Sequence, residues 1–167
     1  MLRRIAPLLD TVAGHWATAA GLILAAIVGV TTVNAALFLA DRVAGVWGGD
    51  IAGLPGYEDA VRLLLSAAAP MFLPWCQARR GHVVAEILGR GEGGFARGLD
   101  RLWAGATAFL CAFLGWFMAQ GLAEARADGV LSPVLGWPEW PFYLPGLVSL
   151  ALWGAIAGTQ AAGAEAR

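Results

Sequence analysis

The fold is decided by an uncharged stretch of 22 residues, LWAGATAFLCAFLGWFMAQGLA, at positions 102–123. About 20 predominantly apolar residues suffice for a helix to cross the hydrocarbon core of a bilayer. Further uncharged runs occupy residues 11–40, 63–78 and 140–164. The run at 63–78 is short, but Ala60 and Val61 extend it, and the side chain of Arg62 can reach toward the lipid headgroups. The sequence therefore predicts an all-α integral membrane protein, a single domain over 1–167 with four transmembrane helices at about 16–40, 60–78, 102–123 and 140–164.

The composition supports lipid as the solvent for most of the chain. Hydrophobic residues make up 59% of the sequence and charged residues 14%, whereas an ordinary soluble domain carries about 25% charged residues. The formal net charge is −1, which gives no electrostatic footprint for nucleic acid. Cys76 and Cys111 lie far apart in separate apolar runs, so we expect no disulfide scaffold.

The arginines predict the orientation. With both termini in the cytoplasm, eight arginines fall on the inside, in the N-terminal segment, the inner loop 79–101 and the C-terminus. Three fall on the outside, in or beside the outer loops 41–59 and 124–139: Arg42, Arg62 and Arg126. This ratio satisfies the positive-inside rule, and six of the eight tryptophans fall at the expected membrane interfaces. Arg3 and Arg4 precede the first run as in a signal peptide, but the run is too long for one, so we expect it to stay uncleaved.

The connections between the spans carry three further signals. Glu58 and Asp59 begin the second span, where they either stabilise a helix N-terminus or contact a partner. Pro70 and Pro74 predict a kink in that span. In the inner loop, the apolar residues share one helical face, which predicts a short amphipathic helix at the membrane interface between spans two and three: Val83, Val84, Ile87 and Leu88.

The predicted spans lack the side chains that coupled transport or haem binding would need. Their uncharged runs offer no carboxylate for coupled transport, and His15 and His82 lie at span boundaries, where they do not supply facing haem ligands at membrane depth. We therefore expect no enzyme activity, no cofactor and no metal. Small residues at four-residue spacing predict close helix packing, either within the chain or against a second membrane protein: Gly21, Ala25 and Gly29, and Gly154 and Gly158.

Several of these features together resemble a known family. They are the four spans with inward termini, the Tyr57-Glu58 start of the second span, the segment ARRGHVVAEIL at 78–88, and LGWPEW at 135–140. The combination resembles the small membrane subunit, or Q-type small permease, of tripartite ATP-independent periplasmic (TRAP) transporters. Val84 and Glu86 stand where the family pattern has a basic residue and an aspartate.

The resemblance implies a scaffold subunit of a secondary-active, sodium-coupled importer of organic anions, of which carboxylates are the usual kind, in the bacterial inner membrane. A large multi-span membrane subunit would hold the substrate site, and a periplasmic binding protein would deliver the substrate. By position, four residues would contact the large subunit or lipid at the inner face: Arg79, Arg80, His82 and Glu86. Four others would contact the binding protein or the large subunit at the outer face: Glu58, Asp59, Trp137 and Glu139.

Two other classes of protein remain open at this point. A membrane anchor subunit of a redox or other peripheral complex would need haem or quinone ligands in the spans. A self-sufficient small transporter or channel would need a charged group at membrane depth. The uncharged runs supply neither.

Overall fold

The computed structural model describes residues 2–80 and 94–163, which form helices joined by loops. The elements are α1 (Leu2–Gly45), α2 (Tyr57–Met71), α3 (Leu73–Ala78), α4 (Gly94–Ala127), the 3-10 helix η2 (Trp140–Phe142) and α5 (Tyr143–Ala161). Within these two ranges no strand forms, and a single β-bridge joins Leu131 to Pro138. The predicted all-α class is therefore confirmed for the described residues.

Among the described residues, three helices are long and apolar enough to cross a membrane: Ile5–Gly45, Arg97–Ala127 and Trp140–Ala161. The remaining predicted span is divided into α2 and α3 by an interruption at Phe72. Pro74 has no N–H to donate to the carbonyl of Pro70 four residues earlier, so the helix cannot continue unbroken there. The four-span count stays a prediction, while the break falls where the prolines require it.

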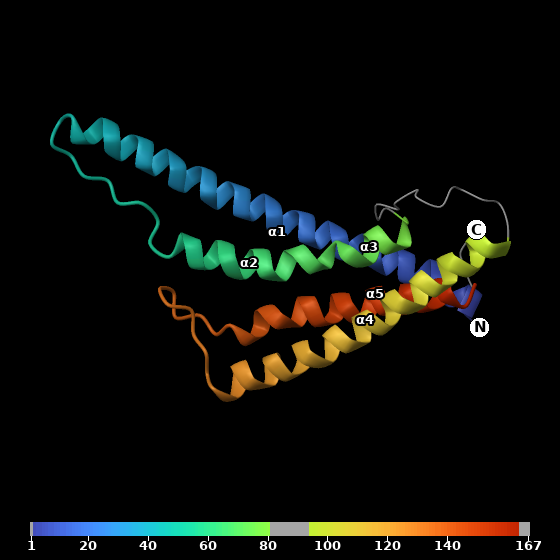
Figure 1. Ribbon diagram of the computed structural model, residues 1–167. Coiled ribbons are helices and arrows are strands. Elements are labelled where there is room, and N and C mark those ends of the chain that lie inside the picture. Colours follow the sequence, from blue (N-terminus) through green and yellow to red (C-terminus); the bar gives the residue numbers. More distant parts are fainter. Residues whose placement is uncertain (1, 81–93, 164–167) are drawn as a thin grey trace.

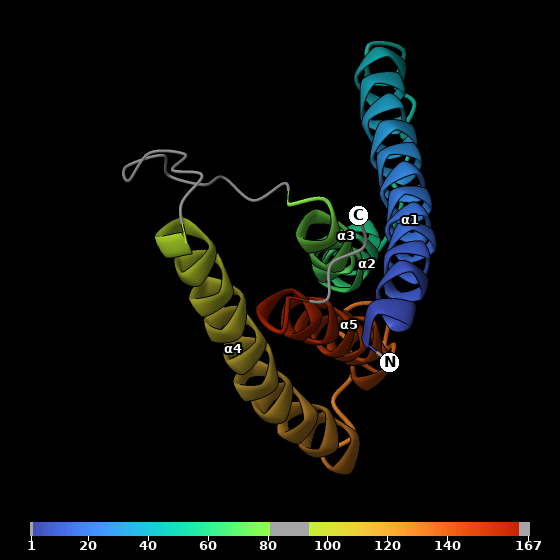
Figure 2. The ribbon, with the colours of Figure 1, turned by 90° about the vertical axis from the view of Figure 1, so that its right-hand side faces the viewer.

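The helices lie side by side in an unequal arrangement (Figure 1). The α2–α3 segment packs between α1 and α5, and α1 also contacts α5, so these elements form one group. Helix α4 stands at the edge of this group and, among the described elements, packs only against α5 and η2; Figure 2 shows it beside α5 and away from α1. One long side of α4 is therefore not covered by any other described element.

The chain direction places both termini at the same end of the molecule. The N-terminal end of α1, the end of α3, the start of α4 and the end of α5 all lie at that end (Figure 1). The loops that follow α1 and α4 lie at the opposite end. The predicted short amphipathic helix in the inner loop, together with His82 and Glu86, lies outside the described residues.

Helix α1 is much longer than the predicted span 16–40. Its 44 residues correspond to about 66 Å at 1.5 Å per residue, compared with a hydrocarbon core of about 30 Å. Pro7 lies inside the helix near its beginning, and the helix ends only at Gly45, before a glycine-containing turn. The charged residues that bounded the predicted span therefore mark the edge of the apolar section and not the ends of the helix.

The buried side of α1 follows a seven-residue repeat. Its fully packed positions are Ala6, Ala13, Ala20, Ile27 and Asn34, with Ala17 between them. A seven-residue spacing keeps one side of a helix facing its partner, whereas four-residue steps drift around the helix. Small alanines along this side let α2, α3 and α5 come close.

The predicted packing stripe of α1 is corrected by this arrangement. Ala25 and Gly29 are exposed, and a Cβ placed on Gly21 or Gly29 would meet no atom within 4 Å. The stripe lies off the seven-residue seam, so it makes no close helix contact within the described chain. Its alternative role as a surface for a second membrane protein stays a prediction.

Helix α5 approaches α4 closely at two glycines. A Cβ on Gly154 would lie 3.1 Å from the Cβ of Cys111, and a Cβ on Gly146 would overlap the side chain of Met118. Gly158, in contrast, has open space around its Cα. Of the predicted packing glycines in α5, Gly154 therefore lies at a helix contact and Gly158 does not.

Candidate functional site

At the outer end, the start of α2 holds the loop that precedes α5. The carboxylate of Asp59 is buried and accepts hydrogen bonds from the backbone N–H groups of Val134, at 2.7 Å, and Leu135, at 3.2 Å. The bond from Val134 is the main reason that the pKa of Asp59 lies below its ordinary value. Gly56 adopts a left-handed conformation with φ 74°, and a Cβ there would overlap the side chain of Leu135. The loop is therefore seated directly on the first turn of α2.

A second contact fastens the same loop. The guanidinium of Arg62, one turn further along α2, lies 2.5 Å from the carboxylate of Glu139. The backbone N–H of Glu139 donates to the carbonyl of Val130, which closes the loop on itself. Arg62 and Glu139 thus form an ion pair within the chain, immediately before η2 begins.

These contacts show how the predicted outer-face residues are held within the chain, while their contact with a partner stays a prediction. Asp59 and Glu139 bind the chain's own loop, so their carboxylates are engaged before any partner arrives. Glu58 is exposed, and so is Trp137, whose backbone pairs with Ser132. The sequence cannot distinguish the engaged acids from the exposed one, because the groups that engage them lie more than 70 residues away.

The first outer loop is fastened to α1 in a similar way. Asn34 is buried, and its side-chain oxygen accepts a hydrogen bond of 2.9 Å from the backbone N–H of Leu54. Asp41 accepts another of 2.9 Å from Ile51. The glycine-rich loop therefore folds back along the last turns of α1, and the side chain of Asn34 helps to hold it there.

At the inner end, the two described arginines make different contacts. The guanidinium of Arg79 lies over the ring of Trp75 at 4.4 Å and is exposed. Arg80 has a left-handed backbone, with φ 51°, and its side chain lies 3.9 Å from the carboxylate of Asp100 on α4. Arg80 therefore connects the end of α3 to the beginning of α4 across the inner loop.

Between the helices, polar side chains pair with one another. The side-chain amide of Gln77 donates to the side-chain oxygen of Gln160 at 2.6 Å, and the indole of Trp153 donates to Gln77 at 3.0 Å. Further along α5, the indole of Trp16 donates to the hydroxyl of Ser149, which in turn donates to a backbone carbonyl. These groups join α1 and α3 to α5, which is the packing role that polar side chains have inside membranes.

The described residues hold no group of three or more His, Cys, Asp or Glu side chains that could bind a metal ion. The two cysteines are on different helices, Cys76 on α3 and Cys111 on α4, and neither forms a disulfide in the described chain.

The long apolar helices, with most of their surface turned outward and their polar groups paired with each other, define a helical membrane protein. The family of tripartite ATP-independent periplasmic transporters, DctQ component, matches residues 51–165. The chain belongs to this family, the small subunit of these transporters, and the resemblance drawn from the sequence is confirmed. No curated protein and no solved structure was found to match the chain.

Proposed function

We propose that the chain is a scaffold subunit that supports the large membrane subunit of a sodium-coupled importer and carries no substrate site of its own. A periplasmic binding protein delivers an organic anion, a carboxylate by preference, to the large subunit. In this proposal the chain crosses the bacterial inner membrane four times with both termini in the cytoplasm.

One observation carries the proposal: in the described residues, polar side chains that lie between the helices form hydrogen bonds with each other. Gln77, Gln160 and Trp153 form one such group, and Trp16 and Ser149 another. The uncharged runs at 11–40, 63–78, 102–123 and 140–164 add no charged group to them. A substrate or ion pathway at membrane depth needs polar or ionisable groups that face it, whereas a scaffold needs only packed helices.

Helix α4 is the best surface for the large subunit. Its uncovered side carries a row of phenylalanines one turn apart, Phe109, Phe113 and Phe117, whose neighbouring ring centroids are 6.5 and 4.9 Å apart. All three rings are at least half exposed, as is Trp116 beside them. Aromatic side chains are enriched at protein interfaces because they bury a large area at a small cost in conformational entropy.

On the outer side, we assign the contact with the binding protein to the residues that the loop contacts leave exposed. Glu58 and Trp137 are exposed, beside the fastened loop of Asp59 and Glu139. In this assignment Asp59 and Glu139 shape the surface, and Glu58 and Trp137 meet the partner.

Uptake by the reconstituted transporter tests the proposal. Vesicles would contain the large subunit with or without this chain, together with the binding protein and a panel of radiolabelled organic acids. The scaffold function predicts that omitting the chain abolishes uptake, and that Gln120→Leu, a change at an exposed polar residue of α4, leaves the KM for substrate unchanged. Unaltered uptake without the chain would contradict the proposal.

A further inference from the structure

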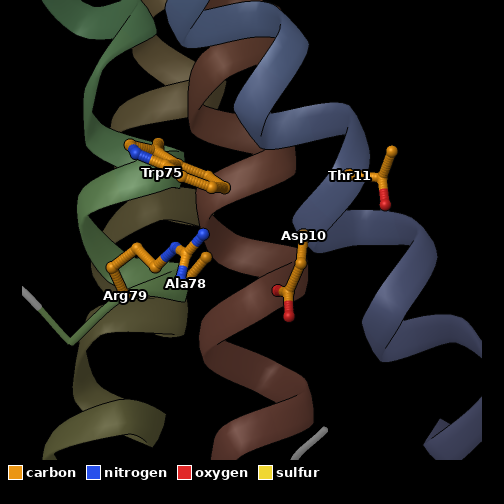
Figure 3. A pocket seen from close by; sticks show the side chains of 5 residues that line it. All are labelled: Asp10, Thr11, Trp75, Ala78 and Arg79. Carbon is orange, nitrogen blue, oxygen red and sulfur yellow. The ribbon is translucent and has the colours of Figure 1, made fainter.

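A pocket of about 380 Å³ lies between α1 and α3 at the inner end of the molecule, away from the outer loops and from the exposed row on α4. It is lined by Asp10 and Thr11 from α1 and by Trp75, Ala78 and Arg79 from the end of α3. Figure 3 shows the carboxylate of Asp10 and the guanidinium of Arg79 on opposite sides of this space, with the ring of Trp75 beside them. None of these side chains takes part in the contacts of the proposed function.

The pocket follows from one close helix contact. Trp75 packs against Gly14 of α1, where a Cβ would lie 3.1 Å from the indole ring. Asp10 lies four residues before Gly14, and Arg79 four residues after Trp75, so each lies one helical turn beyond the contact. Because the two helices run in opposite directions, both charges are brought to the same level. The contact at Gly14 thus places an anion and a cation across one gap.

The two charges do not neutralise each other directly. The guanidinium of Arg79 rests on the ring of Trp75, and no ion pair within the described chain includes Asp10 or Arg79. Asp10 is half-buried at the wall of the pocket and Arg79 is exposed at its edge. The gap therefore offers a cationic and an anionic contact to one molecule that carries both opposite charges.

The level of the pocket in the membrane is given by the sequence. Asp10 immediately precedes the uncharged run 11–40, and Arg79 immediately follows the run 63–78. Both charges therefore lie where the apolar section ends, which is the depth of phospholipid headgroups. Leu22 is an exposed apolar side chain of α1 within the uncharged run 11–40.

We propose that this pocket binds the headgroup of phosphatidylethanolamine, with the phosphate on Arg79 and the ammonium on Asp10. A primary ammonium has three N–H donors for a carboxylate, while a choline headgroup has none and a glycerol headgroup lacks the positive charge. Arg79 is held in place by Trp75, which lowers the entropic cost of binding the phosphate. The inference depends on the membrane location of the chain and not on its role in transport.

Native mass spectrometry of the purified full-length chain in detergent tests the proposal. The probes are phosphatidylethanolamine, phosphatidylcholine and phosphatidylglycerol with identical palmitoyl and oleoyl chains, added in equal amounts. One partly exposed ionic contact predicts a preference of about two- to fivefold for phosphatidylethanolamine over the other two. Equal retention of the three lipids by the native chain would overturn the proposal.

Substitutions in the pocket test whether the preference for phosphatidylethanolamine arises there. Asp10→Asn should abolish the preference for phosphatidylethanolamine, Asp10→Glu should retain it, and Arg79→Gln should reduce the retention of all three lipids. Arg126→Gln is the matched control, since Arg126 also lies over a tryptophan, Trp140, at 5.3 Å, but does not line this pocket. A preference that persists in Asp10→Asn, or that is lost equally in Arg126→Gln, would place the lipid elsewhere and overturn the proposal.

Discussion

The carboxylate of Asp59 lies 2.7 Å from the backbone nitrogen of Val134 and accepts its hydrogen bond across 75 positions of sequence. This bond joins the first turn of α2 to the loop between α4 and η2. It therefore fixes the outer end of the molecule, where the binding protein is proposed to dock, before α5 begins.

Replacing Asp59 tests this fastening through its pH dependence. The hydrogen bonds lower the pKa of Asp59 below its ordinary value of 3.8, so the carboxylate stabilises the folded chain fully above that value. This stabilisation is lost as the pH falls through the lower pKa of the folded state. Asp59→Asn should thus lower the unfolding temperature in detergent at pH 7, and the difference from the native chain should shrink below about pH 3.8.

Glu58→Gln is the control for that experiment, because Glu58 is the neighbouring acid and is exposed. It should unfold at the temperature of the native chain across the whole pH range. If Glu58→Gln lowers the unfolding temperature as much as Asp59→Asn does, then the negative charge at the start of α2 stabilises this end, and the hydrogen bond to the loop does not.

The contact between α4 and α5 should be sensitive to a larger side chain at Gly154. Gly154→Leu forces a side chain against Cys111, 3.1 Å from where its Cβ would lie, and overpacking of this kind costs about 1–3 kcal/mol. Gly158→Leu introduces the same side chain into open space and should be nearly neutral. Thermal unfolding in detergent compares the two variants. An equal decrease in their unfolding temperatures would show that α5 does not approach α4 at Gly154.

The polar group between α3 and α5 should make a small, measurable contribution. Gln77→Leu removes the partner of Gln160 and of the Trp153 indole, and such bonds contribute roughly 0.6–1.7 kcal/mol in membrane proteins. Gln120→Leu changes an exposed glutamine of α4 and should not lower stability. If the Gln77→Leu chain is as stable as the Gln120→Leu chain, the hydrogen bonds of Gln77 do not stabilise the packing of α3 on α5.

The aromatic row of α4 should bind the large subunit. Truncation of a central aromatic at an interface weakens binding by about fivefold or more, so Phe113→Ala should reduce the amount of large subunit that co-purifies with the tagged chain. Phe38→Ala is the matched control, since Phe38 is similarly exposed but lies on α1. Equal recovery with both variants would exclude this side of α4 as the contact.

Hydrophobic runs and proline chemistry were sufficient to predict the apolar helices and the interruption near Pro70 and Pro74. Both depend on local properties of the chain: the length of an uncharged run, and the missing N–H of proline. The extension of α1 to Gly45 was missed because charged residues end an apolar section without ending a helix.

The partners of the polar residues could not be predicted. Asp59 accepts hydrogen bonds from backbone N–H groups, which every residue except proline carries. No side-chain pattern in the sequence therefore marks Val134 as the donor. The buried side of α1 did leave a signal, since Ala6, Ala13 and Ala20 recur every seven residues. The four-residue spacing of small residues instead predicted close packing at Gly21 and Gly29, where a Cβ would meet no atom within 4 Å.

Co-purification with the native large subunit tests the central claim most directly. The full-length chain would be tagged, co-produced with the large multi-span subunit of its own transporter, and extracted in mild detergent. The scaffold account predicts a stable complex that contains both proteins and shows no haem absorption. Recovery of the chain without the large subunit, or with a haem-containing complex in its place, would contradict the account.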